Sequence, residues 1–305
     1  MSANSKSVLI FGATGMFGRE LYRESRERRF RTFGASRHGP DVWVDFMDGN
    51  AVHEAIVEMR PDIVINSGAI VSHSTCEESP ELAYSVNSRP VAFMAMAARE
   101  TGCRLVQIST DHFFSGDGFA LHDEEAPVTL LNEYARTKYA GEAFALTCAG
   151  SLVVRTNITG FREESAVESF IEWVFSMLES QEEFNLFEDY FASTISTRQA
   201  SSVLFDLLEH NVSGRINLAC REAVSKKHFV ETVADRLGLG PPHARSVSVH
   251  DFLSSRAESV GLDVSRAETV LGRRLPDLEA VVGQLVSEFE TRKNRCGGIS
   301  RAVSA

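Results

Sequence analysis

The chain has few cysteines, and they follow no recognisable pattern. Its five cysteines, at positions 76, 103, 148, 220 and 296, are odd in number and scattered, and none belongs to a Cys-x-x-Cys pair. A disulfide framework or a structural zinc site would require paired or regularly spaced cysteines. We therefore predict neither a disulfide-stabilised fold nor a bound metal.

Long apolar runs and an excess of basic residues are also missing. No apolar run approaches the about 18 residues of a membrane span, and the first six residues lack the apolar core of a secretion signal. The 31 basic and 42 acidic residues give a net charge of −11, which disfavours nucleic acid and anionic membranes as partners. We expect a cytoplasmic protein that attracts anionic ligands through local arginines. The protein could also form a homodimer.

Three side chains suited to hydride transfer stand at informative spacings. Thr110 follows a predicted buried strand, 104–109, while Tyr134 and Lys138 share one face of a predicted helix of about 132–148. In a carbonyl reduction the phenol would protonate the oxygen, the ammonium would favour the phenolate and bind a cofactor ribose, and the hydroxyl would polarise the substrate oxygen. Because Tyr-x-x-x-Lys is also common in surface helices, this interpretation needs a cofactor site in support.

A glycine-rich turn near the N-terminus supplies that support. An apolar strand, 7–11, runs into a G-x-x-G-x-x-G turn, and a helix is expected to follow to about residue 28. The first glycine allows the tight turn, the second lets the backbone approach a pyrophosphate, and the third lets the helix pack closely on the sheet. The order of strand, turn and helix indicates a dinucleotide site. Its expected contacts here are Gly12, Thr14, Gly15, Met16, Phe17 and Gly18.

The end of the second predicted strand bears on the choice of cofactor. This strand, 31–35, is followed by Ser36 and Arg37 and not by an acidic residue that would bind a ribose 2′-hydroxyl. A hydroxyl beside an arginine suits a 2′-phosphate, so the sequence favours NADP over NAD, the alternative for Arg37 being a solvated loop charge. Asp45 could accept a hydrogen bond from the adenine amino group or cap the helix that begins near Asp48, and both alternatives stay open.

Several motifs together resemble a known family. They are Gly12-Ala-Thr-Gly-Met-Phe-Gly18, Ile65-Asn-Ser-Gly-Ala69, Ser109-Thr-Asp111, Tyr134-x-x-x-Lys138 and Val154-Arg-Thr156. This set resembles the extended short-chain dehydrogenase/reductases and, among them, most closely the dTDP-4-dehydrorhamnose reductase family. Later segments, 189–197, 214–219 and 262–267, also match, so the resemblance spans about residues 7–288.

The resemblance implies both a fold and a reaction. The fold is α/β, a Rossmann-like doubly wound parallel sheet with a smaller C-terminal substrate-binding domain. The reaction is the NAD(P)H-dependent reduction of the 4-keto group of a nucleotide-linked 6-deoxysugar, with Thr110, Tyr134 and Lys138 as catalytic residues. By the same resemblance, Lys138 also contacts the cofactor, whose nicotinamide side is lined by Asn66, Ser67, Gly68 and Ala69.

The alternation of predicted strands and helices up to about residue 160 is typical of right-handed βαβ crossovers. We expect residues 1–160, together with about 194–220, to form the NAD(P)-binding domain. The substrate-binding domain is expected from about 161–193 and 221–293, and residues 294–305 are expected to be a mobile tail.

The sequence departs from the family where the sugar nucleotide should bind. The segment after Ala69 lacks the family's usual Asp-Lys pair, His112 replaces a tyrosine, and Asn157-Ile158 stands where Ser-Trp is common. The Arg-Pro that usually opens the C-terminal substrate segment is Arg256-Ala257 here. The residues expected to contact the substrate are Val71, His73, Asp111, His112, Asn157 and Arg256. For each histidine taken singly, a packed or solvent-facing side chain is the alternative.

Two other functions stay open. The same scaffold and catalytic residues occur in sugar-nucleotide epimerases and dehydratases, although His112, where dehydratases have a second acid after Asp111, disfavours dehydration. The regulatory β subunit of methionine adenosyltransferase also resembles this family, and a non-catalytic role would fit the altered substrate segment. A binding-only protein, however, has no chemical need for the phenol of Tyr134.

Overall fold

The centre of the molecule is a parallel β-sheet. The structure is a computed structural model that describes residues 5–38, 41–115, 119–162, 167–251 and 258–302. Its seven-stranded sheet has the order β11-β6-β5-β4-β1-β2-β3, and every neighbouring pair is parallel. In that spatial order the strands are Gly214–Asn217, Leu152–Arg155, Arg104–Ile108, Ile63–Asn66, Ser7–Phe11, Arg31–Ser36 and Val42–Trp43. The predicted Rossmann-like doubly wound sheet is therefore confirmed.

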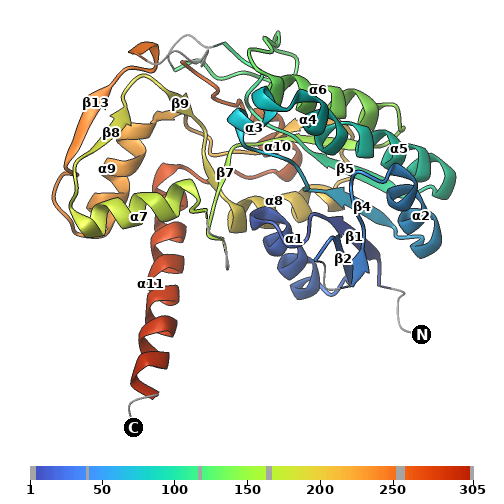
Figure 1. Ribbon diagram of the computed structural model, residues 1–305, viewed down its shortest axis with the longest axis horizontal. Helices are drawn as coiled ribbons and strands as arrows, with labels where there is room; N and C mark the ends of the chain where they lie inside the picture. The colour runs from blue at the N-terminus through green and yellow to red at the C-terminus, as the bar shows by residue number, and fades with distance from the viewer. Residues whose placement is uncertain (1–4, 39–40, 116–118, 163–166, 252–257, 303–305) are drawn as a thin grey trace.

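Helices cover both faces of this sheet (Figure 1). One face carries α1 (Met16–Glu27) and α8 (Thr197–Glu209), and the other carries α2 (Gly49–Met59), α5 (Arg89–Thr101) and α6 (Glu133–Leu146). The strands are apolar on both sides because both sides are covered. In β1, Val8 and Ile10 belong to the hydrophobic cluster under α1, whereas Leu9 and Phe11 belong to the cluster under α2.

A smaller lobe lies beside the sheet and contains three short two-stranded pairings. The pairs are β7 (Ile158–Thr159) with β10 (Ile195–Ser196), β8 (Phe184–Phe187) with β13 (Ala244–Val247), and β9 (Phe191–Ala192) with β12 (Val224–Ser225). The remaining elements are α3 (His73–Glu78), α4 (Pro80–Asn87), α7 (Phe170–Ser180), α9 (Lys226–Arg236), the 3-10 turn Val249–Asp251, α10 (Ser265–Leu271) and α11 (Leu278–Ala302).

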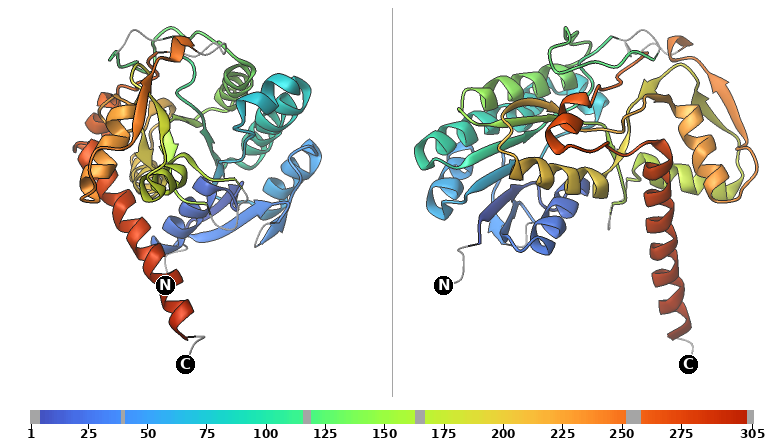
Figure 2. Two further views of the ribbon diagram at one scale, coloured as in Figure 1. Left: turned by 60° about the vertical axis from the view of Figure 1, so that its left-hand side comes forward. Right: turned by 180° about the vertical axis from the view of Figure 1, so that it is seen from behind.

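Helix α11 extends away from the rest of the molecule in Figure 1 and in both views of Figure 2. It continues to Ala302, through most of the segment from residue 294 that the sequence predicts to be a tail. Within the described ranges, no helix combines the length and the apolarity needed to cross a bilayer.

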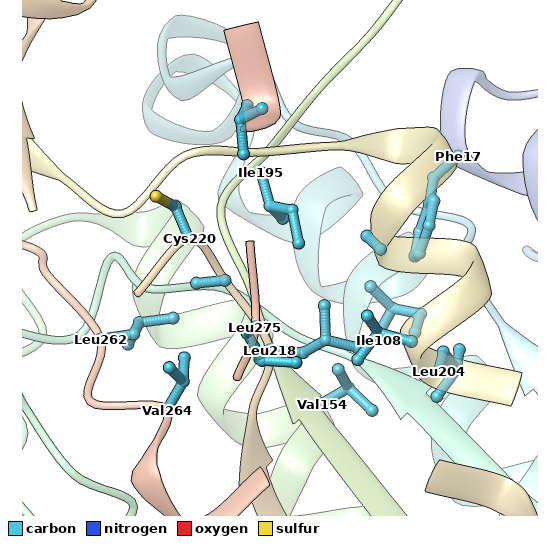
Figure 3. Packing of buried hydrophobic residues seen from close by; sticks show 14 of the residues in the cluster. Phe17, Ile108, Val154, Ile195, Leu204, Leu218, Cys220, Leu262, Val264 and Leu275 are labelled. Atoms are coloured by element: carbon cyan, nitrogen blue, oxygen red, sulfur yellow. The ribbon is translucent and has the colours of Figure 1, made fainter. Parts of the chain in front are cut away.

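The sheet and the smaller lobe share one hydrophobic core. Figure 3 shows Phe17 of α1 and Ile108 of β5 among the buried side chains that also include Leu262 and Leu275 from the C-terminal part of the chain. All four belong to a single continuous cluster of buried residues. Because closely packed cores resist deformation, this cluster fixes the lobe relative to the ends of the strands.

A buried ion network ties α6 to two strands of the sheet. The guanidinium of Arg155 in β6 donates to both carboxylate oxygens of Glu142 in α6, at 3.0 and 2.9 Å. Arg215 in β11 donates to the same carboxylate at 3.1 Å. Glu142 and Arg155 are at most 1% exposed, so each charge depends on the other for its compensation.

We predict that Arg155→Met lowers the free energy of unfolding by about 3–5 kcal/mol, because it leaves the buried carboxylate of Glu142 with Arg215 as its main partner. Urea unfolding followed by circular dichroism measures this change. The control is Arg245→Met, which removes an exposed pair with Glu183 and should change the free energy by less than about 1 kcal/mol. Equal losses in the two variants would contradict a structural role for the buried network.

Candidate active site

Three adjoining hollows follow the carboxyl ends of the strands. The glycine hollow, of about 440 Å³, is lined by the glycine-rich turn and the end of β2. The tyrosine hollow, of about 320 Å³, contains Tyr134 and Lys138, and the aromatic hollow, of about 670 Å³, reaches into the smaller lobe. Ser67 lines the first two, and His112 lines the last two. Together the hollows form one continuous surface at the switch point of the sheet, where such folds bind ligands.

Each glycine of the turn has its own structural role. Gly12 has a φ of +77°, in the left-handed region that favours glycine. A Cβ atom at Gly18 would lie 2.0 Å from the carbonyl oxygen of Gly12, so only glycine lets α1 pack this closely. Gly15 is the N-cap of α1 and lines the glycine hollow. The exposed backbone at this helix start is the arrangement that binds a pyrophosphate.

The outer part of the glycine hollow is lined by Ser36, Arg37 and Asp45. A carboxylate oxygen of Asp45 accepts a hydrogen bond from the backbone of Met47 at 3.0 Å. The N-cap of α2 is instead Asp48, whose side chain accepts from two backbone N–H groups of the first turn. The sequence-based alternative that Asp45 caps this helix is therefore wrong, and its side chain lies beside the hollow.

The loop after β4 contributes to two hollows, but one of its residues does so indirectly. Ser67, Gly68 and Ala69 line the glycine hollow. Asn66 is 1% exposed, donates to the side chain of Gln107 at 2.8 Å and accepts from the backbone of Gly68 at 3.1 Å. Asn66 therefore shapes the loop from behind and does not line the hollow as we expected.

Thr110, Tyr134 and Lys138 meet in the tyrosine hollow. The start of α6 is fixed by Asn132, whose side chain accepts from the backbone of Ala135 at 2.8 Å. The Thr110 hydroxyl donates to the carboxylate of Asp111 at 3.3 Å and lies in the same hollow as the Tyr134 phenol. Lys138 Nζ donates to the backbone carbonyl at the end of β5, at 2.7 Å. The two neighbouring elements thus bring the hydroxyl, the phenol and the ammonium together.

Burial sets the protonation of these groups. It raises the pKa of Tyr134, and the neighbouring Thr110 side chain opposes this shift. It also lowers the pKa of Lys138 to about 8, against the charge of Glu142 one helical turn away. The sequence predicts that Lys138 favours the phenolate, but the loss of solvent around the phenol shifts the pKa of Tyr134 in the opposite direction. Tyr134 is therefore protonated at neutral pH, as a proton donor must be.

Three buried hydroxyls in the tyrosine hollow indicate that it suits a polar ligand. They belong to Ser109, Thr156 and Thr159, and within the described part of the chain none of them has a hydrogen-bond partner. Buried hydroxyl groups in proteins normally have such a partner. The open hydroxyls and the glycine cradle beside them fit a nicotinamide dinucleotide. Among the described residues no cluster of three potential metal ligands is present.

Asp111 links the tyrosine hollow to the smaller lobe. Its carboxylate accepts from the side-chain amide of Asn157, whose oxygen in turn accepts from the Thr194 hydroxyl at 2.9 Å. Burial raises the pKa of Asp111 to about 6, while the hydrogen bond from Asn157 and the positive charge of Lys226 oppose the shift. Asp111 and Asn157, both predicted substrate contacts, are thus held in one polar chain.

Two histidines lie against the candidate proton donor. The ring of His73 stacks on that of Tyr134 with 5.0 Å between centroids, and the ring of His112 meets it edge-on at 5.7 Å. Both line the tyrosine hollow, as does Val71, which is 55% exposed at its rim. The histidines are therefore placed at the reaction centre, whereas Arg256 lies outside the described residues.

Most of the aromatic hollow was not foreseen from the sequence. Its additional lining includes Phe170, Trp173, Asn185, Phe187, Tyr190 and Lys226. These residues come from α7, from the β8–β9 region and from the start of α9. The aromatic side chains of the segment assigned to the substrate domain were the one available signal, because nothing local predicts that these segments converge.

Comparison with known proteins places the chain among relatives of similar length. The family model of the RmlD substrate binding domain matches residues 6–291. The probable low-salt glycan biosynthesis reductase Agl14 of Haloferax volcanii is 29% identical over 293 residues, or 92% of this chain and 98% of the relative. Methionine adenosyltransferase 2 subunit beta of Mus musculus is 28% identical over 286 residues, or 89% of this chain and 85% of the relative.

The fold also matches solved structures. A crystal structure of dTDP-4-dehydrorhamnose reductase from Bacillus anthracis str. Ames in complex with NADP superposes with a TM-score of 0.84 at 22% identity, covering 93% of this chain and 99% of that one. The family model extends over almost the same residues as the resemblance found in the sequence, which is confirmed. The chain belongs to the RmlD substrate binding domain family.

Proposed function

We propose that this protein is an NAD(P)H-dependent reductase of the 4-keto group of a nucleotide-linked 6-deoxysugar, with NADP as the favoured cofactor. The observation that carries this proposal is the convergence of Thr110, Tyr134 and Lys138 between the glycine hollow and the aromatic hollow. A relative that is named a reductase and a similarly folded reductase in complex with NADP support the same reaction class.

A bound nicotinamide dinucleotide would supply the hydride, and the residues of the chain would control the substrate oxygen. The Thr110 hydroxyl holds the carbonyl oxygen near the phenol, and Tyr134 donates its proton to that oxygen as the alcohol forms. Lys138 lies one helical turn from Tyr134 and stabilises the negative charge that the phenol acquires. The stacked ring of His73 helps to fix the phenol for this transfer.

The two alternative functions have weaker support. A regulatory role is favoured by the similarity to the methionine adenosyltransferase subunit, but it would leave the buried phenol beside Thr110 without a chemical purpose. Dehydratases ordinarily have a second acid after the position of Asp111, and this chain has His112 there, which disfavours dehydration. Reduction uses Thr110, Tyr134 and Lys138 together, and all three line the tyrosine hollow.

We predict that Tyr134→Phe reduces turnover by about 10²- to 10⁴-fold, because the variant loses the proton donor. Dinucleotide affinity should be unchanged, since the glycine hollow that binds most of the cofactor is intact. Steady-state kinetics and a fluorescence titration with NADPH measure the two quantities. Near-normal turnover in this variant would exclude Tyr134 as the donor.

The cofactor preference can be tested at Arg37. If Ser36 and Arg37 bind the 2′-phosphate, Arg37→Ala should weaken NADPH binding by about 1–3 kcal/mol and leave NADH binding nearly unchanged. Arg31→Ala, at the opposite end of β2, serves as the control and should affect neither cofactor. Calorimetric titration with each cofactor gives the comparison, and equal losses for NADPH and NADH would contradict the assignment.

We predict that the enzyme prefers a sugar nucleotide other than dTDP-4-dehydrorhamnose. The segment from Ile70 to Glu77 lacks the Asp-Lys pair that is usual in the family. Asn157-Ile158 stands where the family commonly has Ser-Trp, and the side chain of Asn157 donates a hydrogen bond to Asp111. The contacts that would orient dTDP-4-dehydrorhamnose are therefore changed, whereas Thr110, Tyr134 and Lys138 are retained. The measurement is kcat/KM across dTDP-, GDP-, CDP- and UDP-linked 4-keto sugars. A clear best value with dTDP-4-dehydrorhamnose would defeat the prediction.

A further inference from the structure

We propose that the ammonium group of Lys226 binds the diphosphate of the nucleotide-linked substrate. This inference rests on the proposed function and identifies a binding residue that the sequence did not indicate. Lys226 is the first residue of α9, where Ser225 caps the helix by accepting from the backbone of His228 at 3.1 Å. The preceding strand β12 pairs with β9, and this pairing fixes the start of α9 within the smaller lobe.

Aromatic rings hold the Lys226 side chain at the aromatic hollow. Its Nζ atom lies 4.3 Å from the ring centre of Phe170 and 5.7 Å from that of Tyr190. The backbone N–H of Lys226 also donates to the carbonyl oxygen of Tyr190 at 3.1 Å. An ammonium over aromatic faces gains a favourable electrostatic interaction, and the rings restrict where it can point. The cation is therefore positioned before any ligand arrives.

The charge balance around Lys226 favours an anionic ligand. Among the described residues that line the aromatic hollow, Lys226 is the sole lysine or arginine, and none is acidic. Burial lowers the pKa of Lys226 to about 8, and the charge of Asp111, which lines the adjoining tyrosine hollow, opposes this shift only in part. A partly buried cation that lacks a close carboxylate gains strongly from a phosphate oxygen. In a chain with a net charge of −11, an anion needs such a local cation.

The position of Lys226 also suits the shape of the substrate. The keto carbon must lie against Thr110 and Tyr134, whereas the diphosphate leaves the sugar from the opposite side of its ring. Lys226 lines the aromatic hollow and not the tyrosine hollow, and it does so together with His112 and Asn157, which both hollows share. The sugar then lies between the phenol and the ammonium, and the nucleoside extends among the aromatic side chains.

The proposed role of Lys226 is tested by variants that remove its positive charge and keep the aliphatic part of its side chain. Lys226→Met keeps the apolar length that packs on Phe170 and removes the ammonium, and Lys226→Arg restores a cation. Lys227→Met is the matched control, because the neighbouring ammonium donates to Ser246 on the surface, at 2.9 Å. Isothermal titration in the presence of NADP compares dTDP, UDP, GDP and CDP with their parent nucleosides for each variant.

We expect Lys226→Met to weaken the tightest-bound nucleoside diphosphate by about 10- to 100-fold, the usual effect of a lost charge-assisted contact. Nucleoside affinity should be unchanged, Lys226→Arg should recover most of the loss, and Lys227→Met should match the unmodified protein. In turnover assays, KM for the sugar nucleotide should rise while kcat changes little.

Three results would overturn the proposal. One is equal weakening of nucleoside and nucleoside diphosphate, which would assign Lys226 a purely structural role. Another is a fall in kcat with unchanged diphosphate affinity, which would place the residue in the reaction itself. The third is a protein that binds no nucleoside diphosphate. Because the titration needs no turnover, Lys226-dependent diphosphate binding without reductase activity would refute the proposed function and leave this inference standing.

Discussion

The ion network around Glu142 is the constraint on which the site depends. Tyr134, Lys138 and Glu142 follow one another at intervals of four residues on α6, so they share one face of that helix. Glu142 is fixed to β6 through Arg155 and to β11 through Arg215. These contacts set the rotation of α6 about its own axis, and that rotation decides whether the phenol and the ammonium face the strand ends. The same carboxylate also stabilises the charged form of Lys138.

Loss of solvent is the common cause of the unusual protonation at the site. Burial raises the pKa values of Tyr134 and Asp111 and lowers those of Lys138 and Lys226. All four shifts favour the neutral form, but at pH 7 both lysines, with pKa values of about 8, and Asp111, with a pKa of about 6, still carry most of their charge. A phosphate bound beside either lysine would stabilise its charged form further. Ligand binding and the readiness of the site for chemistry are therefore coupled by electrostatics, without a need for a change in fold.

Local rules made the cofactor half of the molecule predictable from the sequence. The glycine turn is dictated by backbone sterics at Gly12 and by the close packing at Gly18, and the meeting of Tyr134 with Thr110 follows from helical spacing and a strand end. The rest depends on contacts between distant segments. Lys226 reaches the site only because β12 pairs with β9, and the direction of the Tyr134 shift depends on how completely the phenol is buried. Neither property has a sequence pattern of its own.

This difference explains how one chain can be similar both to a protein named a probable reductase and to one named methionine adenosyltransferase 2 subunit beta. The cofactor half is specified by short motifs, so it survives extensive divergence elsewhere. The aromatic hollow is assembled from α7, the β8–β9 region and α9, which touch through the shared core and not through a common motif. Single substitutions in any of these segments can change what the hollow binds while the strand ends stay in place. Specificity in this fold is therefore a property of the packing between its two parts, and similarity along the sequence constrains the reaction more tightly than the substrate.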